Sequence, residues 1–276
     1  MTPFVRLVSV LLFAFTASAS AQFQPQVGQA GKDVIWVPTP DDVVERMLTM
    51  AQTGPNDIHF DLGAGDGKIA IMAAKKFGAR ATGVEYNPDM VKHANANAQA
   101  AGVAGTGKGQ AQIRHGDIFA TDFSQATVIT LYLLPALNMK LRPTILSMRP
   151  GTRVVSHSFT MEDWEADEIS SMDGRRAYFW VVPANVHGGW AMESGGEKNE
   201  LSFEQRFQKI DGNVTLGASI HGGLRDARLR GFNISFALVD NNGVLRNYSG
   251  RVVGNKMEGS YRGDNGSEGR WTATKK

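Results

Sequence analysis

Short apolar runs alternate with amphipathic segments over the first two thirds of the chain. The alternation opens at Thr39-Pro40-Asp41-Asp42, where a hydroxyl cap, a proline and two acids precede a helix with one apolar face. Further helices are expected over 68–77, 89–101 and 136–148, and strands over 58–61, 81–85, 112–115, 127–133 and 153–158. Such alternation predicts an α/β fold with a parallel sheet, whose ligands bind beyond the carboxyl ends of the strands.

Two more strands are expected over 166–172 and 175–182, joined as a hairpin by Asp173-Gly174. From residue 183 the pattern becomes short strands separated by glycine turns, which predicts a small antiparallel all-β domain: a meander, a sandwich or a small barrel. Its Trp190, Tyr261 and Trp271 are expected in the core rather than in a ligand groove. The strands are expected over 200–210, 214–221, 227–230, 232–239, 244–248, 251–253, 256–261 and 269–274, with turns at 211–212, 241–243 and 254–255.

The first residues have the pattern of a secretory signal: Arg6, an apolar run over 7–17, and Ala19-Ser20-Ala21 as a cleavage site. We therefore expect an exported protein, periplasmic or secreted, with no stable membrane span after cleavage. The predicted organisation is a signal peptide over 1–21, a linker over 22–32, an α/β domain over 33–184 and a β-rich domain over 185–276.

The amino-acid composition excludes few classes of function. The chain has 276 residues, 42% of them hydrophobic and 20% charged, as in an ordinary folded protein. A formal net charge of +2 creates no strong basic field, so no nucleic-acid partner is expected. Cysteine is absent, the histidines are scattered, and no metal site is predicted.

A glycine-rich turn follows the strand at 58–61 and opens the next helix. Glycine at positions 63, 65 and 67 lets the backbone take positive φ and approach a ligand closely. The dinucleotide spacing G-x-G-x-x-G fails because Lys68 occupies the third position. Asp61 and Asp66 would also repel a pyrophosphate at this helix N-terminus. A cationic cofactor such as S-adenosylmethionine would instead be favoured by an acid there.

Two further acids follow later strands. Glu85 lies 24 residues after Asp61 and can accept hydrogen bonds from both ribose hydroxyls of a nucleoside. Asp117 ends the third strand, where it can meet an adenine amine while Ile118 covers the ring.

These signatures together resemble the class I S-adenosylmethionine-dependent methyltransferases, whose first motif is D-x-G-x-G-x-G. The resemblance covers roughly residues 30–184 and implies a Rossmann-like seven-stranded sheet ending in an antiparallel pair. With Val37-Pro38-Thr39-Pro40 in front, the chain is similar to the small lysine methyltransferases of mitochondrial carrier and ATP-synthase proteins. The resemblance implies as cofactor contacts Thr39, Asp61, Gly63, Ala64, Gly65, Glu85, Asp117 and Ile118.

The methyl acceptor is less closely defined. The segment 130–135 lacks the Asn or Asp that grips an exocyclic base amine, so base methylation is disfavoured. Tyr132 is a candidate wall of the methyl site or a packing residue, and His157 is a candidate proton acceptor or a structural histidine. We expect transfer to an amine, with a protein lysine first and a small molecule second. The alternative is an exported binding module that retains the sheet as a scaffold, and the oligomeric state stays open.

Overall fold

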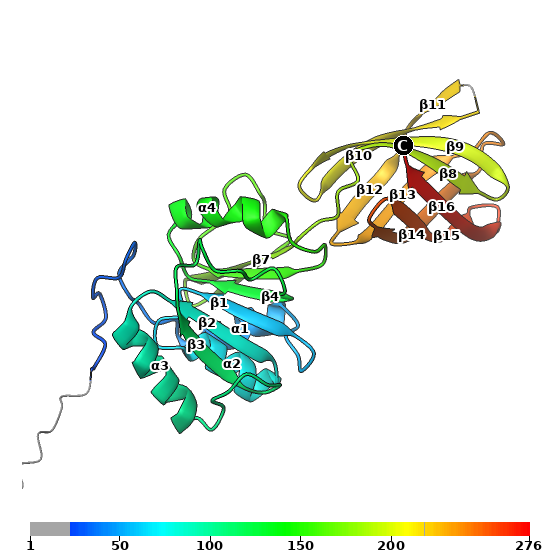
Figure 1. The fold of residues 1–276 in the computed structure, drawn as a ribbon. Coiled ribbons are helices and arrows are strands. Elements are labelled where there is room, and N and C mark those ends of the chain that lie inside the picture. Colours follow the sequence, from blue (N-terminus) through cyan, green and yellow to red (C-terminus); the bar gives the residue numbers. More distant parts are fainter. Residues whose placement is uncertain (1–22, 218) are drawn as a thin grey trace, which may run out of the picture.

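The computed structural model describes residues 23–217 and 219–276, so the predicted signal peptide over 1–21 lies outside the described residues. A seven-stranded sheet and a separate nine-stranded sheet form two units (Figure 1). The first unit contains α1 (Asp41–Met50), β1 (Ile58–Leu62), α2 (Lys68–Phe77), β2 (Arg80–Glu85), α3 (Pro88–Ala100), β3 (Ala111–His115), β4 (Val128–Leu131), α4 (Pro135–Leu146), β5 (Arg153–His157), β6 (Glu168–Met172) and β7 (Arg175–Val181).

The order of the first sheet is β3-β2-β1-β4-β5-β7-β6. Strands β1 to β5 are parallel, and β7 and β6 close the edge in antiparallel pairing, which confirms the predicted architecture. The hairpin turn has φ 46° at Asp173 and φ 78° at Gly174, as a type I′ turn requires. The strand order reverses between β1 and β4, so the ligand crevice is expected above their carboxyl ends.

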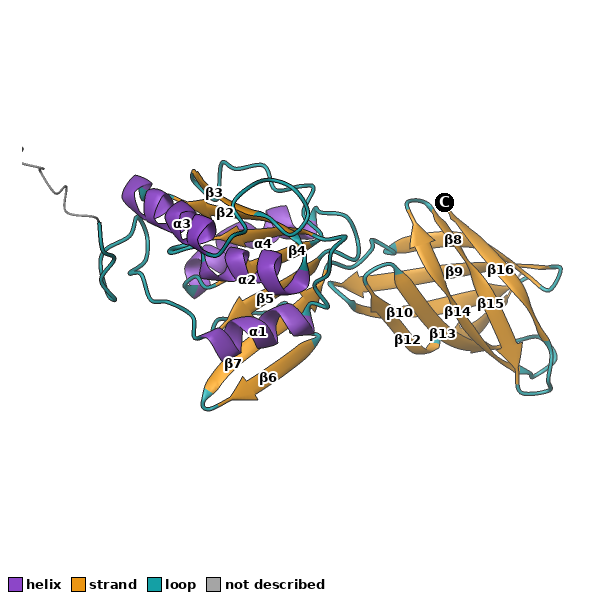
Figure 2. Ribbon diagram, turned by 90° about the horizontal axis from the view of Figure 1, so that it is seen from below, coloured by secondary structure: helices purple, strands orange, loops and turns teal. Residues whose placement is uncertain are grey.

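Helices cover both faces of this sheet, as Figures 1 and 2 show. Helix α1 buries its apolar face, with Met47 and Leu48 fully enclosed, against α2 and one side of the sheet. Leu141 and Ile145 of α4 join a second core on the other side. Both faces of the parallel strands are therefore covered, and a ligand is expected at the carboxyl ends of the strands.

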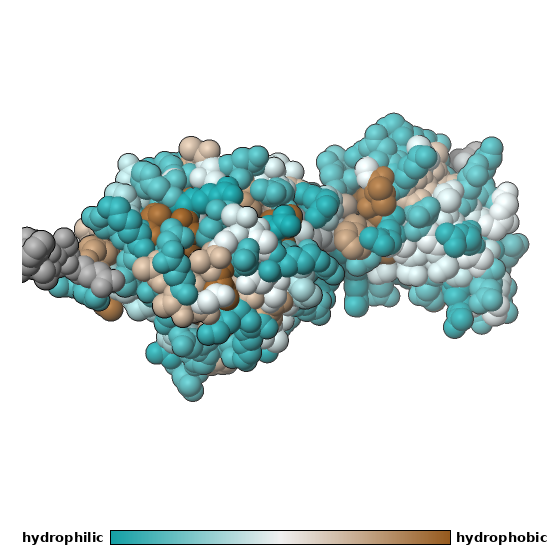
Figure 3. All heavy atoms as spheres, turned by 60° about the horizontal axis from the view of Figure 1, so that its bottom comes forward, coloured by the Kyte–Doolittle hydropathy of each residue, from teal (hydrophilic) through white to brown (hydrophobic). Residues whose placement is uncertain are grey.

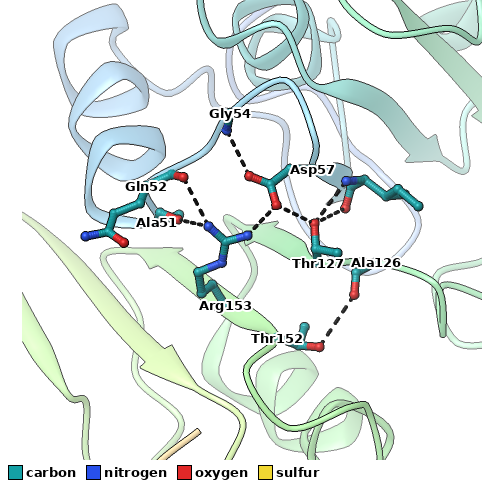
Figure 4. A network of polar contacts seen from close by, with 9 residues as sticks. Ala51, Gln52, Gly54, Asp57, Ala126, Thr127, Thr152 and Arg153 are labelled. Atoms are coloured by element: carbon teal, nitrogen blue, oxygen red, sulfur yellow. Dashed lines mark hydrogen bonds and ion pairs between the residues drawn. The ribbon is translucent and has the colours of Figure 1, made fainter. Parts of the chain in front are cut away.

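A polar network holds the amino ends of the parallel strands (Figure 4). The Arg153 guanidinium donates to the Ala51 and Gln52 carbonyls, at 2.7 and 3.1 Å, and pairs with the Asp57 carboxylate. Thr127 Oγ1 donates to the same carboxylate at 2.7 Å. The network joins the end of α1 to the starts of three strands.

The second sheet is wholly antiparallel, in the order β11-β10-β9-β8-β16-β15-β14-β13-β12. It curls until β12 lies against β10, around a core that holds Trp190, Tyr261 and Trp271 as predicted. Its strands are β8 (Gly188–Ser194), β9 (Glu197–Arg206), β10 (Lys209–Leu216), β11 (Ser219–Gly223), β12 (Arg225–Arg230), β13 (Asn233–Val239), β14 (Leu245–Val253), β15 (Lys256–Gly263) and β16 (Glu268–Lys275).

Several expected limits in this unit are wrong. The turn expected at 211–212 lies inside β10, because Gly212 pairs with Phe203. A side chain at Gly212 would meet the Ser202 carbonyl at 2.7 Å, so the glycine serves close packing there. The chain reverses instead after Phe207, whose φ is 55°. Strand β8 was not expected, and the runs 244–248 and 251–253 form one strand.

The two units meet at the amino end of β5. The Ala184 N–H donates to the Gly231 carbonyl at 2.8 Å, and a side chain at Gly151 would touch the Phe232 ring at 2.8 Å. Arg206 and Asp163 add an ion pair at 3.1 Å. The second unit is thus attached at the end of the sheet opposite the glycine-rich turn. Within the described residues, no helix is long and apolar enough to cross a membrane.

Candidate functional site

A cavity of about 360 Å³ opens above the carboxyl ends of β1, β2 and β4. Its size suits a cofactor-sized ligand. The predicted residues that line it, from five separate segments of the chain, are Thr39, Asp61, Gly63, Ala64, Gly65, Glu85, Asp117, Ile118 and Tyr132. The fold thus brings together every predicted site residue except His157.

The glycine-rich turn forms the floor of the cavity. Its glycines have φ of 87° at Gly63, 53° at Gly65 and 80° at Gly67, values that ordinary side chains rarely adopt. A Cβ atom at Gly65 would stand 2.5 Å from Trp36 Nε1. The turn therefore presents bare backbone to the ligand, with the amino end of α2 behind it.

Glu85 closes one side of the turn. Its Oε2 accepts the Gly65 N–H at 3.0 Å, and its Oε1 accepts the Asn87 N–H at 2.8 Å. Each oxygen keeps a second lone pair. The carboxylate is therefore held in place and can still accept the two hydroxyls of a ribose.

Asp61 is the most unusual group in the cavity wall. It is 2% exposed, and Thr130 Oγ1 donates to its Oδ1 at 2.8 Å. Its Oδ2 has no hydrogen-bond partner among the described residues. Burial, assisted by the nearby charges of Asp66 and Glu85, raises the pKa of Asp61 to about 7. A cationic group of a ligand would satisfy Oδ2 and stabilise the carboxylate.

The Asp117 carboxylate already has partners within the protein. Lys32 Nζ pairs with its Oδ2 at 2.6 Å, and the Phe119 N–H donates to its Oδ1 at 2.9 Å. The Lys32 hydrogen bond holds the pKa of Asp117 below its usual range. Lys32 also lies 4.7 Å from the Tyr86 ring centre. An adenine amine at Asp117 would share the carboxylate with this lysine.

The segment around Lys32 is a part of the site that the sequence pattern did not predict. An isolated bridge pairs Ala30 with Ile35, and the Gly28 N–H donates to the Trp36 carbonyl at 2.8 Å, which closes a small hairpin. Residues 29–39 of this hairpin and its continuation line the cavity. The apolar run Val34-Ile35-Trp36-Val37 within a polar stretch was the available signal.

His157 lies behind the wall rather than in it. It is 3% exposed, and its Nδ1 lies 3.2 Å from Thr39 Oγ1. The Tyr132 ring packs over it with centroids 4.1 Å apart. Burial, with the nearby Arg175 charge, lowers the pKa of His157 to about 4, so the imidazole is neutral. These contacts position Thr39 and Tyr132, and a catalytic role for either Tyr132 or His157 stays a prediction.

The donor set fits S-adenosylmethionine better than a phosphate-bearing cofactor. An unpaired buried carboxylate oxygen suits its ammonium or sulfonium, and Glu85 suits its ribose. No group of three His, Cys, Asp or Glu side chains in the described part of the chain is arranged to hold a metal ion.

Comparison with known proteins points the same way. Residues 61–168 match a family described as the ANTKMT methyltransferase domain. A protein-lysine N-methyltransferase of Saccharolobus islandicus is 44% identical over 155 residues, which are 54% of this chain and 94% of that protein. A lysine N-methyltransferase of Mus musculus that is named for an ATP synthase component is 30% identical over 59% of this chain, and the match spans 65% of the mouse protein, just under two thirds.

A similar protein of known structure is named for a different methyl acceptor. An RNA methyltransferase from Salinibacter ruber, crystallised with S-adenosyl-L-homocysteine, is 48% identical with a TM-score of 0.52. The alignment covers 54% of this chain and 96% of that one.

Proposed function

Because the chain belongs to the protein-lysine N-methyltransferase family, we propose that it methylates the ε-amine of a lysine in a protein acceptor. The chain is an S-adenosylmethionine-dependent methyltransferase. The lysine acceptor rests on one observation, the 44% identity to a protein-lysine N-methyltransferase over 94% of that relative's length.

The cavity mouth supports an aliphatic amine as acceptor. Tyr132 and Phe159 stack at 6.1 Å between ring centroids, and both line the cavity. Ile35, Val37 and Leu134 also line it and are exposed. Apolar walls can cover the methylene stem of a lysine and favour its neutral amine by removing water.

The bound cofactor supplies an electrophilic methyl group. The lone pair of the acceptor amine would form the new carbon–nitrogen bond as the carbon–sulfur bond of the cofactor breaks. The electrons of the broken bond would remain on sulfur, and the methylated nitrogen would then lose a proton. The protein must hold the two reactants in line and exclude water. Asp61 and Glu85 orient one reactant, and the apolar mouth orients the other.

The acceptor can be identified by labelling. Cell extract is incubated with the purified protein and S-adenosylmethionine carrying a radioactive methyl group, and the labelled material is hydrolysed completely and separated. Labelled N-methyl-lysine that disappears with Asp61→Asn supports the proposal. Lys75→Gln, which likewise replaces a charged group by an amide but at an exposed position of α2, is the matched control and should leave labelling unchanged.

Two other outcomes would reject the lysine acceptor. Label confined to a methylated nucleoside would favour RNA, the acceptor for which the Salinibacter ruber relative is named. Label in a small molecule would favour a metabolite. The absence of Asn and Asp from 130–135 argues against an exocyclic base amine.

Export is a second part of the proposal, motivated by the signal pattern over residues 1–21. Fusing residues 1–30 to a reporter that is active only outside the cytosol tests it directly. Reporter activity that is lost when Leu11 and Leu12 are replaced by arginine supports export. An inactive reporter would place the enzyme with its cofactor in the cytosol.

A further inference from the structure

The outer face of strands β12 to β16 carries an unusual concentration of arginine. Backbone pairing aligns three rows of outward positions across these five strands. The rows are Arg225, Ala237, Asn247, Arg262 and Glu268; Arg228, Ser235, Ser249, Ser260 and Arg270; and Arg230, Asn233, Arg251, Glu258 and Thr272. Six of these positions are arginine, two are glutamate and none is lysine.

The middle row forms the floor of a groove. Ser235, Ser249 and Ser260 are direct neighbours on adjacent strands, with Arg228 and Arg270 at the two ends. Because neighbouring strands lie about 4.8 Å apart, four steps give this row a length of about 19 Å. Two adjoining hollows of about 690 and 820 Å³ follow it and share the serines.

The groove is framed by charge. Arg230, Arg251 and Glu258 stand along one side. Arg262, Glu268 and Asp226 stand along the other. Strands β13 to β16 lie side by side in Figure 2, and Figure 3 shows a pale area on the second unit bordered by hydrophilic side chains. The groove therefore combines a floor of small polar groups with a lining in which five arginines outnumber three carboxylates.

Most of these cations lack an anionic partner. Arg262 pairs with Glu268 at 3.6 Å. Among the described residues, no carboxylate lies within 4.0 Å of the other five guanidinium groups. Arg251 instead stacks over the Phe232 ring at 4.2 Å. Arg230 lies 5.9 Å from the Phe179 ring of the first unit. Arg228, Arg251 and Arg270 share the groove and repel one another, and an anionic ligand relieves that repulsion.

We propose that this groove binds the phosphodiester backbone of a single-stranded nucleic acid. Arginine and serine are among the side chains that contact phosphate oxygens most often, and the arginine fork matches phosphate geometry. An extended nucleic-acid strand would lie along the serine row, with its phosphates within reach of the arginines on both sides of the groove.

Other anionic partners fit less well. A specific protein interface would need apolar or aromatic anchors, and the three rows contain none larger than Ala237. A lipid surface is flat and cannot enter a groove. The three rows also contain no aromatic residue on which bases could stack, so binding is independent of sequence. The expectation of no nucleic-acid partner rested on the net charge of +2, which conceals this local concentration.

The test uses the full chain and a fluorescent oligouridylate of about 12 nucleotides, within the usual site size. The variant Arg228→Ser/Arg270→Ser should weaken binding at least about tenfold and reduce the salt slope by about 1.4, since each lost phosphate contact removes about 0.7. The matched control Arg80→Ser/Arg114→Ser removes the same charge from exposed positions of the first unit and should bind normally. S-adenosylmethionine binding should be unchanged in both, because neither pair lines the cavity.

Three results would overturn the proposal: no binding at physiological salt, equal weakening in both double variants, or competition by polyglutamate or anionic vesicles as strong as by oligouridylate. Thermal unfolding of each variant excludes misfolding as the cause. If the serine change itself disturbs the sheet, Arg228→Lys/Arg270→Lys keeps the charge but not the fork and should give an intermediate affinity with an unchanged salt slope.

Discussion

Thr130 Oγ1 donates its proton to Asp61 Oδ1 at 2.8 Å, across adjacent strands. The Thr130 hydroxyl has only one proton, and it donates that proton to Asp61. His59 Nε2 lies 2.9 Å from Thr130 Oγ1, so the histidine must be the donor in that contact. Burial lowers the pKa of His59 to about 3, so the ring is neutral. This chain of contacts satisfies one oxygen of Asp61 from below and leaves the other free for the ligand.

We expect the affinity for S-adenosylmethionine to depend on pH through Asp61. The pKa of Asp61 in the free protein is about 7, and a cationic ligand needs the ionised form. Below pH 7 binding must therefore release a proton, and the affinity should fall by up to about tenfold per pH unit. Titration calorimetry from pH 5.5 to 8 measures this dependence.

The Asp61→Asn variant is the control for this pH dependence. It should bind S-adenosylmethionine weakly with little dependence on pH over the same range. An Asp61→Asn profile that still follows a group with a pKa near 7 would assign the titration to another residue.

The same substitution should stabilise the protein at neutral pH. The folded-state pKa of Asp61 is raised from 3.8 to about 7, so its contribution to stability is greatest below pH 4 and is lost as the pH rises through 7. Asparagine avoids burying the charge, which costs up to about 4 kcal/mol at pH 8. Denaturant unfolding at pH 5 and pH 8 should show a clearly larger gain at pH 8, because more of the unfavourable charge is buried there. A loss at pH 8 would contradict this account.

Gly65→Ala should weaken S-adenosylmethionine binding at least about tenfold. Its φ of 53° disfavours a side chain, and the new Cβ would collide with Trp36. Gly78→Ala is the matched control, since it has φ 74° at the end of α2 and does not line the cavity. It should cost about 1–2 kcal/mol of stability and leave affinity unchanged. Equal losses of affinity in both variants would mean that the effect comes through folding.

Arg153→Met should reduce the free energy of unfolding by about 3 kcal/mol, because it leaves the largely buried Asp57 carboxylate without its cation. Arg80→Met, at an exposed position, should change it by less than about 0.5 kcal/mol. Urea unfolding gives both values. S-adenosylmethionine affinity at a temperature where both variants are folded should not change, since Arg153 lies at the far end of the sheet.

Local patterns predicted the first unit well and the second less well. The helices and strands of the first unit carry caps, apolar faces and glycine turns that act within a few residues. In the second unit Gly212 resembled a turn residue, but its role depends on a neighbouring strand. Phe207 carried no turn signal at all, although the chain reverses there.

The sequence by itself determined the order of elements, the glycine-rich turn and the strand-end acids Asp61, Glu85 and Asp117. These follow from backbone preferences and from the rule that parallel strands present their carboxyl ends at one edge. Only the tertiary structure placed Lys32 and Trp36 over the cavity, put Thr130 beside Asp61, and aligned Arg228 with Arg270 across five strands. Those neighbours depend on strand register and long-range packing, which join residues far apart in the chain and leave no local pattern.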